Sequence, residues 1–129
     1  MRMQNEIRSA IDLLAPRETA IALKTDGTLL VRDDHGTIVA SGNWPLKSAP
    51  DVQRVIIYLE LPMAPQSHAE IYLGDYVGQE PVEDITDGKV KIKKRVLLAN
   101  TTQRGTTRIK WMEFVNTSQW GSGRVYITR

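Results

Sequence analysis

The sequence predicts an α+β domain that is mostly β: a small barrel with an N-terminal helix and one short late helix. Segments rich in β-branched and aromatic residues alternate with turn residues from residue 19 onward. Apolar residues recur at helical spacing only near the N-terminus and briefly near residue 110. The chain has 129 residues, 41% hydrophobic and 25% charged, which is the size and composition of one folded domain.

The N-terminal helix is expected over Asn5–Leu14. Asn5 can cap its first turn, and Pro16 ends it. One apolar stripe at i, i+3, i+4 and i+7 contains Ile7, Ala10, Ile11 and Leu14. We expect this narrow stripe to pack on a sheet.

A three-stranded meander is expected next, from about Thr19 to Ser41. The dipeptide Asp26-Gly27 and the turn-like DDHG at 33–36 separate its strands. Residues 1–43, the helix and meander, then join residues 44–129 in a single domain.

Residues 44–129 supply the central strands. Val52–Leu61 is the most apolar run, and its β-branched residues favour a central strand. A strand at His68–Gly78 leads into QEPVEDITDG, which we interpret as an acidic loop closing on Asp87-Gly88. RVYIT, residues 124–128, is a final strand.

The strand KVKIKKRVLL, residues 89–98, alternates between two faces. The outer face is a cationic ladder of Lys89, Lys91, Lys93 and Arg95. The inner face has Val90, Ile92, Val96 and Leu98, with Lys94 as the exception. Further along, a spacing of three between Ile109, Met112 and Val115 predicts a short helix that begins at Thr106 or Thr107.

Charge is distributed unevenly along the chain. Residues 1–88 contain 7 Lys and Arg against 14 Asp and Glu, whereas residues 89–129 contain 10 against one. A basic segment of this kind favours a polyanionic partner. The alternative is that the two segments interleave in the fold and neutralise each other.

Several function classes lack the residues they require. The chain has no cysteine, which excludes disulfides, thiolate metal sites and a cysteine nucleophile. His35 and His68 stand at no metal-ligand spacing, and no nucleotide-loop or nucleophile motif occurs. We therefore expect no enzyme, metal or cofactor. Without a signal peptide or membrane segment, the expected location is the cytoplasm, with no membrane partner.

Aromatic side chains and cations together are what a protein uses to hold a nucleobase and its phosphate. The strands RVIIYLELP and AEIYLGDYVG, the segment TTRIKWMEF and the closing RVYIT resemble EVE-type domains of the PUA-like superfamily, over about residues 44–128. Such domains are small barrels whose pocket reads a modified or flipped base. The resemblance implies a PUA-like core over residues 44–129.

The resemblance also implies a set of site residues. The matching positions are Trp44, Tyr58, Asp75, Tyr76 and Trp111. Two aromatic rings would sandwich a base, and Asp75 would accept a hydrogen bond from its edge. The residues expected to contact nucleic acid around this pocket are Lys91, Lys93, Arg95, Thr102, Arg104, Arg108 and Arg124.

Two functions remain open from the sequence. The first is a nucleic-acid or nucleotide-binding module with an aromatic pocket and a basic rim. The second is a free-standing protein-interaction or inhibitor domain that docks on a protein partner by charge complementarity.

Overall fold

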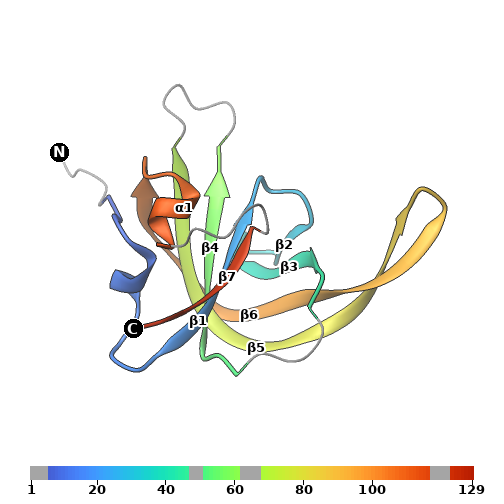
Figure 1. Cartoon of the computed structure of the whole chain (residues 1–129), viewed down its shortest axis with the longest axis horizontal. Coiled ribbons are helices and arrows are strands. Elements are labelled where there is room, and N and C mark those ends of the chain that lie inside the picture. Colours follow the sequence, from blue (N-terminus) through green and yellow to red (C-terminus); the bar gives the residue numbers. More distant parts are fainter. Residues whose placement is uncertain (1–5, 47–50, 62–67, 117–122) are drawn as a thin grey trace.

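The computed structural model describes residues 6–46, 51–61, 68–116 and 123–129, and these are mostly β (Figure 1). The strands are β1 (Thr19–Thr25), β2 (Leu30–Arg32), β3 (Ile38–Trp44), β4 (Arg54–Glu60), β5 (Ala69–Thr86), β6 (Lys89–Thr107) and β7 (Arg124–Thr128). The helical elements are the short 3-10 turn η1 (Ala10–Leu13) and the single-turn helix α1 (Trp111–Phe114). The mostly-β class is confirmed. No described helix is long and apolar enough to cross a membrane.

The seven strands form one mixed sheet in the order β2-β3-β6-β5-β4-β1-β7. β1 and β4 are parallel, and the other neighbours are antiparallel. Within the described residues the edge strands β2 and β7 do not pair with each other, so the sheet is not a closed barrel.

The predicted three-stranded meander is wrong, because β1 does not lie beside β2. β2 and β3 pair as expected, but β1 crosses to the other side of the sheet and lies between β4 and β7. The burial of β1 explains this position: Ala20, Ile21, Ala22 and Leu23 are all fully buried. A strand that is apolar on both faces needs neighbours on both sides and cover above and below, which an edge of a meander does not provide.

Alternating residues of the central strands build two cores, one on each face of the sheet. The first core, on the side of η1 and α1, contains Ala10, Leu14, Ala20, Ala22, Ile56, Tyr58, Ala69, Ile71, Leu73, Phe114, Val115 and Ile127. The second core contains Ile21, Leu23, Ile38, Leu46, Val55, Ile57, Leu59, Val96 and Leu98. The predicted central strand is confirmed as β4, which contributes to both.

The predicted N-terminal helix is wrong over its described residues, Glu6 onward. Glu6 makes a parallel bridge with Thr106, and the Ile7 amide donates to the Thr106 carbonyl at 2.8 Å. Only Ala10–Leu13 turns, as η1. A ten-residue helix is marginal by itself, whereas the open edge of β6 supplies a hydrogen-bonding partner for this segment. Ala10 and Leu14 are buried without a regular helix, and Ile11 is 38% exposed.

In this arrangement two residues of the predicted stripe, Leu14 and Ile11, differ in burial. Leu14→Ala is expected to lower the free energy of unfolding by about 2–3 kcal/mol, because Leu14 is enclosed in the first core. Ile11→Ala is expected to cost less than about 1 kcal/mol, because much of Ile11 already faces solvent. Urea unfolding of both variants measures the difference. Equal losses would instead support the continuous helical stripe.

The predicted acidic loop is also wrong, because residues 79–86 continue β5 as strand. β5 and β6 form a long hairpin that turns at Asp87 and Gly88, both with positive φ (53° and 73°). This conformation is typical of the tight hairpin turn that the Asp-Gly dipeptide favours. Residues of the expected loop instead pair in register with residues of the cationic strand.

The outer part of this hairpin is called the arm, residues 79–96; its base still pairs with β3, and the rest extends away from the body (Figure 1). β4 accompanies β5 only as far as Asp75, and β3 accompanies β6 only as far as Lys94. Beyond these points the ribbon has two strands and no further strand beside it among the described residues. The side chain of Asn43 in β3 still reaches the Asp84 carboxylate by a hydrogen bond. From Gln79↔Val96 to the turn, the register has no bulge.

The short late helix is confirmed as α1, but its predicted start at Thr106 or Thr107 is wrong, because both residues still pair with β5 as the end of β6 and the helix begins at Trp111. Its buried side also differs from the prediction. Phe114 is fully buried in the first core, and Val115 is 6% exposed. Met112, which was expected on the buried side, is 37% exposed, while Trp111 packs against the first core. The buried side therefore follows Trp111, Phe114 and Val115, at i, i+3 and i+4.

Candidate interaction surface: the hairpin arm

The predicted aromatic site is divided between the two faces of the sheet. Tyr58 and Trp111 lie on the first core, where their ring centroids are 5.4 Å apart in an edge-to-face contact. Trp44 and Tyr76 pack against the second core. The structure thus brings Tyr58 and Trp111 together, places Trp44 and Tyr76 on the opposite face, and does not gather the four around a single base.

Tyr58 is a packed core residue. It is 4% exposed, its ring also contacts Phe114, and its hydroxyl donates to the Ile109 carbonyl at 2.7 Å. A ring enclosed in this way offers no free face on which a base could stack. Its placement speaks against the stacking role predicted from the resemblance.

Burial of the Tyr58 hydroxyl, with a smaller effect from Glu60, raises its pKa from 10.0 to about 12. Unfolded chains therefore lose this proton first, and stability should fall between about pH 10 and pH 12, by at most about 2–3 kcal/mol from this group. Urea unfolding at pH 8, 10 and 11 measures the loss. Tyr58→Phe should have a flatter profile over this interval, and an unchanged profile would contradict the assignment.

Trp44 and Tyr76 are only partly buried. The Trp44 indole donates to Ser41 Oγ at 3.3 Å, and its ring lies against Gly123, where an added Cβ would be 3.6 Å away. The Tyr76 hydroxyl is buried and has no hydrogen-bond partner among the described residues. Burial raises the pKa of Tyr76, and Tyr126 adds to the effect.

Asp75, the predicted acceptor for a base edge, already has two partners. Its carboxylate lies 3.4 Å from Arg54 Nε and accepts a hydrogen bond from Asn100 Nδ2 at 2.9 Å. Arg54 is also 3.7 Å from Glu18. Asp75 is therefore part of an ion-pair network that joins β4 to β5 and to the segment before β1.

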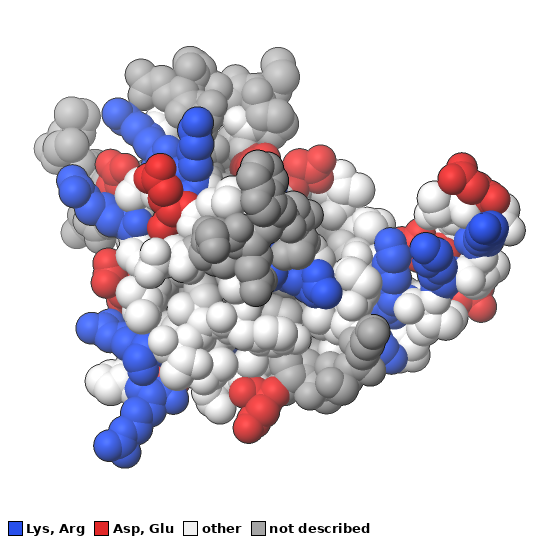
Figure 2. Space-filling model, in the orientation of Figure 1, with Lys and Arg blue, Asp and Glu red and all other residues white. Residues whose placement is uncertain are grey.

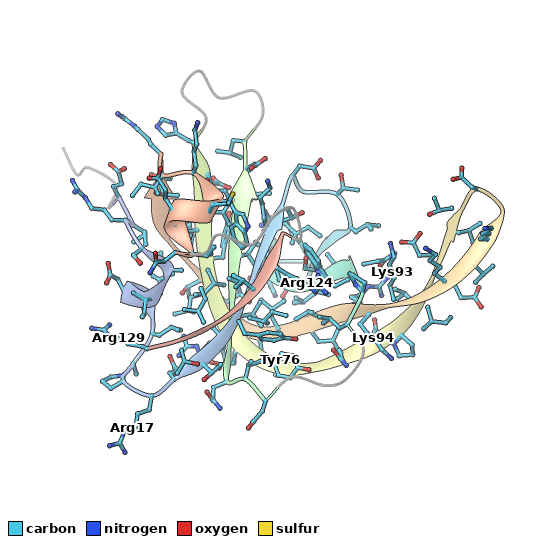
Figure 3. The ribbon with its side chains drawn as sticks, viewed as in Figure 1. Arg17, Tyr76, Lys93, Lys94, Arg124 and Arg129 are labelled. Atoms are coloured by element: carbon cyan, nitrogen blue, oxygen red, sulfur yellow. The ribbon has the colours of Figure 1, made fainter. Side chains whose placement is uncertain are left out.

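The basic residues predicted to contact nucleic acid fall into separate groups. Lys91, Lys93 and Arg95 lie on the arm, and Arg124 begins β7 on the body (Figure 3). Thr102 and Arg104 lie toward the far end of β6, and Arg108 follows it, where its Nε donates to His68 Nε2 at 2.9 Å. The long β6 strand thus separates the arm residues from those near α1.

One face of the arm is charged, as the strand alternation predicted. Its members, called the charged face, are Glu80, Val82, Asp84, Thr86, Lys89, Lys91, Lys93 and Arg95, which the register places on one side. Lys93 Nζ lies 3.0 Å from Asp84, and Arg95 lies 2.7 Å from Glu80. The hydrogen bond from Lys93 is the main cause that lowers the pKa of Asp84.

These ion pairs show that the acidic and basic segments interleave. The arm contains five Lys and Arg and four Asp and Glu, mixed along its length (Figure 2). The charge difference along the sequence is therefore largely neutralised here. The exceptions on the charged face are Lys89 and Lys91, which make no ion pair among the described residues.

The opposite side of the arm, called the apolar face, was missed by the sequence analysis. Its members are Pro81, Glu83, Ile85, Val90, Ile92 and Lys94. Val90 and Ile92 were expected to be buried with Val96 and Leu98. Val96 and Leu98 are buried, but Val90 is 57% and Ile92 60% exposed, because the sheet beneath them has ended.

A signal for the arm was present in the sequence. Around Asp87-Gly88 the acids and bases stand at mirrored positions, Glu80 against Arg95 and Asp84 against Lys91. Opposite charges at equal distances from an Asp-Gly turn favour a hairpin over a loop.

Comparisons with family models, curated proteins and solved structures find no match for this chain. The resemblance to EVE-type domains therefore stays a prediction. Within the described residues, no three acidic or histidine side chains come together in a way that could hold a metal ion.

Proposed function

We propose that the chain binds nucleic acid, and that the charged face of the arm contacts the phosphate backbone. The observation that carries this proposal is the row of four cations on one side of a ribbon that extends from the body. Two of these cations, Lys89 and Lys91 near the tip, have no acidic partner among the described residues. They can approach phosphates without first breaking an ion pair.

The shape of the arm suits this role. A two-stranded β-ribbon fits the major groove of a duplex, and Lys side chains on one face can reach the phosphates on its borders. Phosphate contacts of this kind give affinity with little sequence preference. The proposal places no base between Tyr58 and Trp111, because Tyr58 is enclosed.

The finer fold prediction, a PUA-like barrel with a base-reading pocket, rests on the resemblance within residues 44–128 alone. If it holds, the pocket must use Trp44 and Tyr76 on the second core, since Tyr58 is on the other face. Quenching of tryptophan fluorescence by a nucleotide in the wild type, and its loss in Trp44→Phe, would support this pocket.

Charge reversal at the tip of the arm tests the proposal. Lys89→Glu with Lys91→Glu is expected to weaken binding to a short DNA or RNA duplex. The slope of log K against log salt should become shallower by about 0.7–0.9 for each lost phosphate contact. Fluorescence anisotropy at several salt concentrations measures both quantities, and circular dichroism verifies the fold.

The matched control is Arg8→Glu with Arg17→Glu, which changes the net charge equally at two exposed positions outside the arm. We expect this variant to bind nearly as well as the wild type. Equal weakening by both variants would indicate a general charge effect and contradict a role for the arm. If the wild type binds no single- or double-stranded nucleic acid, the proposed function fails.

A second candidate function, a protein-interaction domain, is favoured by a different observation. The apolar face of the arm exposes Ile85, Val90 and Ile92 side by side. A nucleic-acid backbone is charged and does not bury an apolar surface of this kind. Burial of the surface against a protein partner would stabilise the complex.

A further inference from the structure

The apolar face of the arm is a surface without cover. Ile85 is 68%, Val90 57% and Ile92 60% exposed. Ile85 and Val90 are direct cross-strand partners, and Ile92 lies one step further along the same face. Three large β-branched side chains therefore make one continuous row on a ribbon that has no further strand beside it among the described residues.

Two charged residues, Glu83 and Lys94, also lie on the apolar face. Glu83 pairs in register with Ile92, and Lys94 pairs with Pro81, one step nearer the body. Neither makes an ion pair within the described part of the chain. The apolar face thus carries one acid and one base, both without an ionic partner there, beside its apolar row.

The charges of the arm are sorted between its two faces. The charged face has four cations and two acids, a net charge of +2, whereas the apolar face has a net charge of zero. Two charged faces would repel each other. Two apolar faces would not, because each offers a carboxylate and an ammonium group to the other.

We infer that a second copy of this chain docks on the apolar face, so that two arms pack with their apolar faces together. In a two-fold symmetric pair the same patch meets itself, and each contact occurs twice. Ile85, Val90 and Ile92 of both copies form the buried centre. Glu83 of each copy pairs with Lys94 of the other, and both charged faces remain outward.

Self-complementarity favours this occupant over the others. A polyanion gains nothing from a face whose net charge is zero. A lipid surface would have to take Glu83 into its apolar region without a counter-charge, which is costly. A second copy supplies an apolar row of matching length and both missing counter-charges. The inference is independent of the proposed nucleic-acid binding, which concerns the other face.

The first test is the mass of the full chain as a function of concentration, by sedimentation velocity or light scattering. We expect a monomer–dimer equilibrium with a dissociation constant in the micromolar range, since the row is smaller than a stable dimer interface. Ile92→Thr should weaken association at least about tenfold, because it removes apolar contact at the centre twice over. Lys91→Thr, the adjacent residue on the charged face, should leave association unchanged.

Exchange of the two charges tests the proposed pairing. Glu83→Lys alone and Lys94→Glu alone should each weaken association at least about tenfold, because like charges then meet in the symmetric pair. The double variant Glu83→Lys/Lys94→Glu should restore it, since the patch becomes self-complementary again with reversed signs. If Glu83 and Lys94 served folding alone, the double variant would not recover the association that each single variant loses. Thermal unfolding verifies that each variant folds.

A third measurement uses the absence of cysteine from the chain. Ile92→Cys should form a disulfide-linked dimer under mild oxidation, and Lys91→Cys should do so far less. A wild type that stays monomeric up to about 1 mM, where a contact of micromolar affinity would be almost fully formed, would overturn the inference. Equal cross-linking of both cysteine variants would overturn it too. The same holds if the wild type floats with neutral phospholipid vesicles and Ile92→Thr abolishes this flotation, because the apolar face would then bind lipid.

Discussion

Phe114→Ala is expected to lower the free energy of unfolding by about 3–5 kcal/mol, a larger loss than that expected for Leu14→Ala. Phe114 has no exposed surface, and its ring lies 5.4 Å from the ring of Tyr58. α1 has only four residues, so its position on the sheet depends on its buried side chains, of which Phe114 is the largest that is fully enclosed. Removal leaves a cavity above β4 and loosens the helix.

Met112→Ala is the matched control for this variant. It lies on the same helical turn and is 37% exposed, so its loss should remain below about 1 kcal/mol. Chemical unfolding followed by tryptophan fluorescence measures both. A loss below about 1 kcal/mol for Phe114→Ala would mean that α1 does not stabilise the body of the protein.

Gly74→Val is expected to have the second largest effect, a loss of about 3–4 kcal/mol at the upper end of overpacking costs. Gly74 is buried in β5, one residue before Asp75, where the pairing of β5 with β4 ends. A Cβ there would lie 2.7 Å from Thr101 Oγ1 and 3.2 Å from the Ala99 carbonyl of β6. The two strands would have to separate where the arm is anchored.

The milder change Gly74→Ala allows a rescue experiment. Thr101 Oγ1 is buried without a hydrogen-bond partner among the described residues, so Thr101→Ala by itself should cost little. In the double variant Gly74→Ala/Thr101→Ala the closest contact is gone, and part of the lost stability should return. Strictly additive losses would show that the clash with the β6 backbone decides the effect.

The strands with strong local patterns were predictable. β4 is apolar throughout its centre, the cationic part of β6 alternates regularly, and β7 has β-branched and aromatic residues in sequence. Each of these signals is a property of the segment itself, and the structure preserves it.

The errors have a common physical origin, since they depend on segments distant in sequence. Apolar spacing over Asn5–Leu14 fits a helix, yet the Ile7 amide finds the carbonyl of Thr106, and no local pattern reveals that neighbour. Val90 and Ile92 continue the apolar side of Val96, but they extend beyond the end of the sheet. Where a sheet ends depends on the lengths of the other strands, which one strand does not encode.

The candidate site was predictable where it depends on the pattern of one strand, and not where it depends on a partner segment. Alternation placed Lys91, Lys93 and Arg95 on one face, and the register confirms this. The acids that pair with Lys93 and Arg95 come from a segment interpreted as a loop. The aromatic residues are distributed over two faces because the sheet has a core on each side and these residues come from different elements.

The position of β1 between β4 and β7 has a consequence for the order of folding. The arm closes through a two-residue turn, so its strands can meet within microseconds. β1 precedes both of its partners by long stretches of chain, and closing these loops is slow. We expect the hairpin to form early and β1 to join last. Until then its four buried residues remain exposed, so aggregation during refolding should increase steeply with protein concentration.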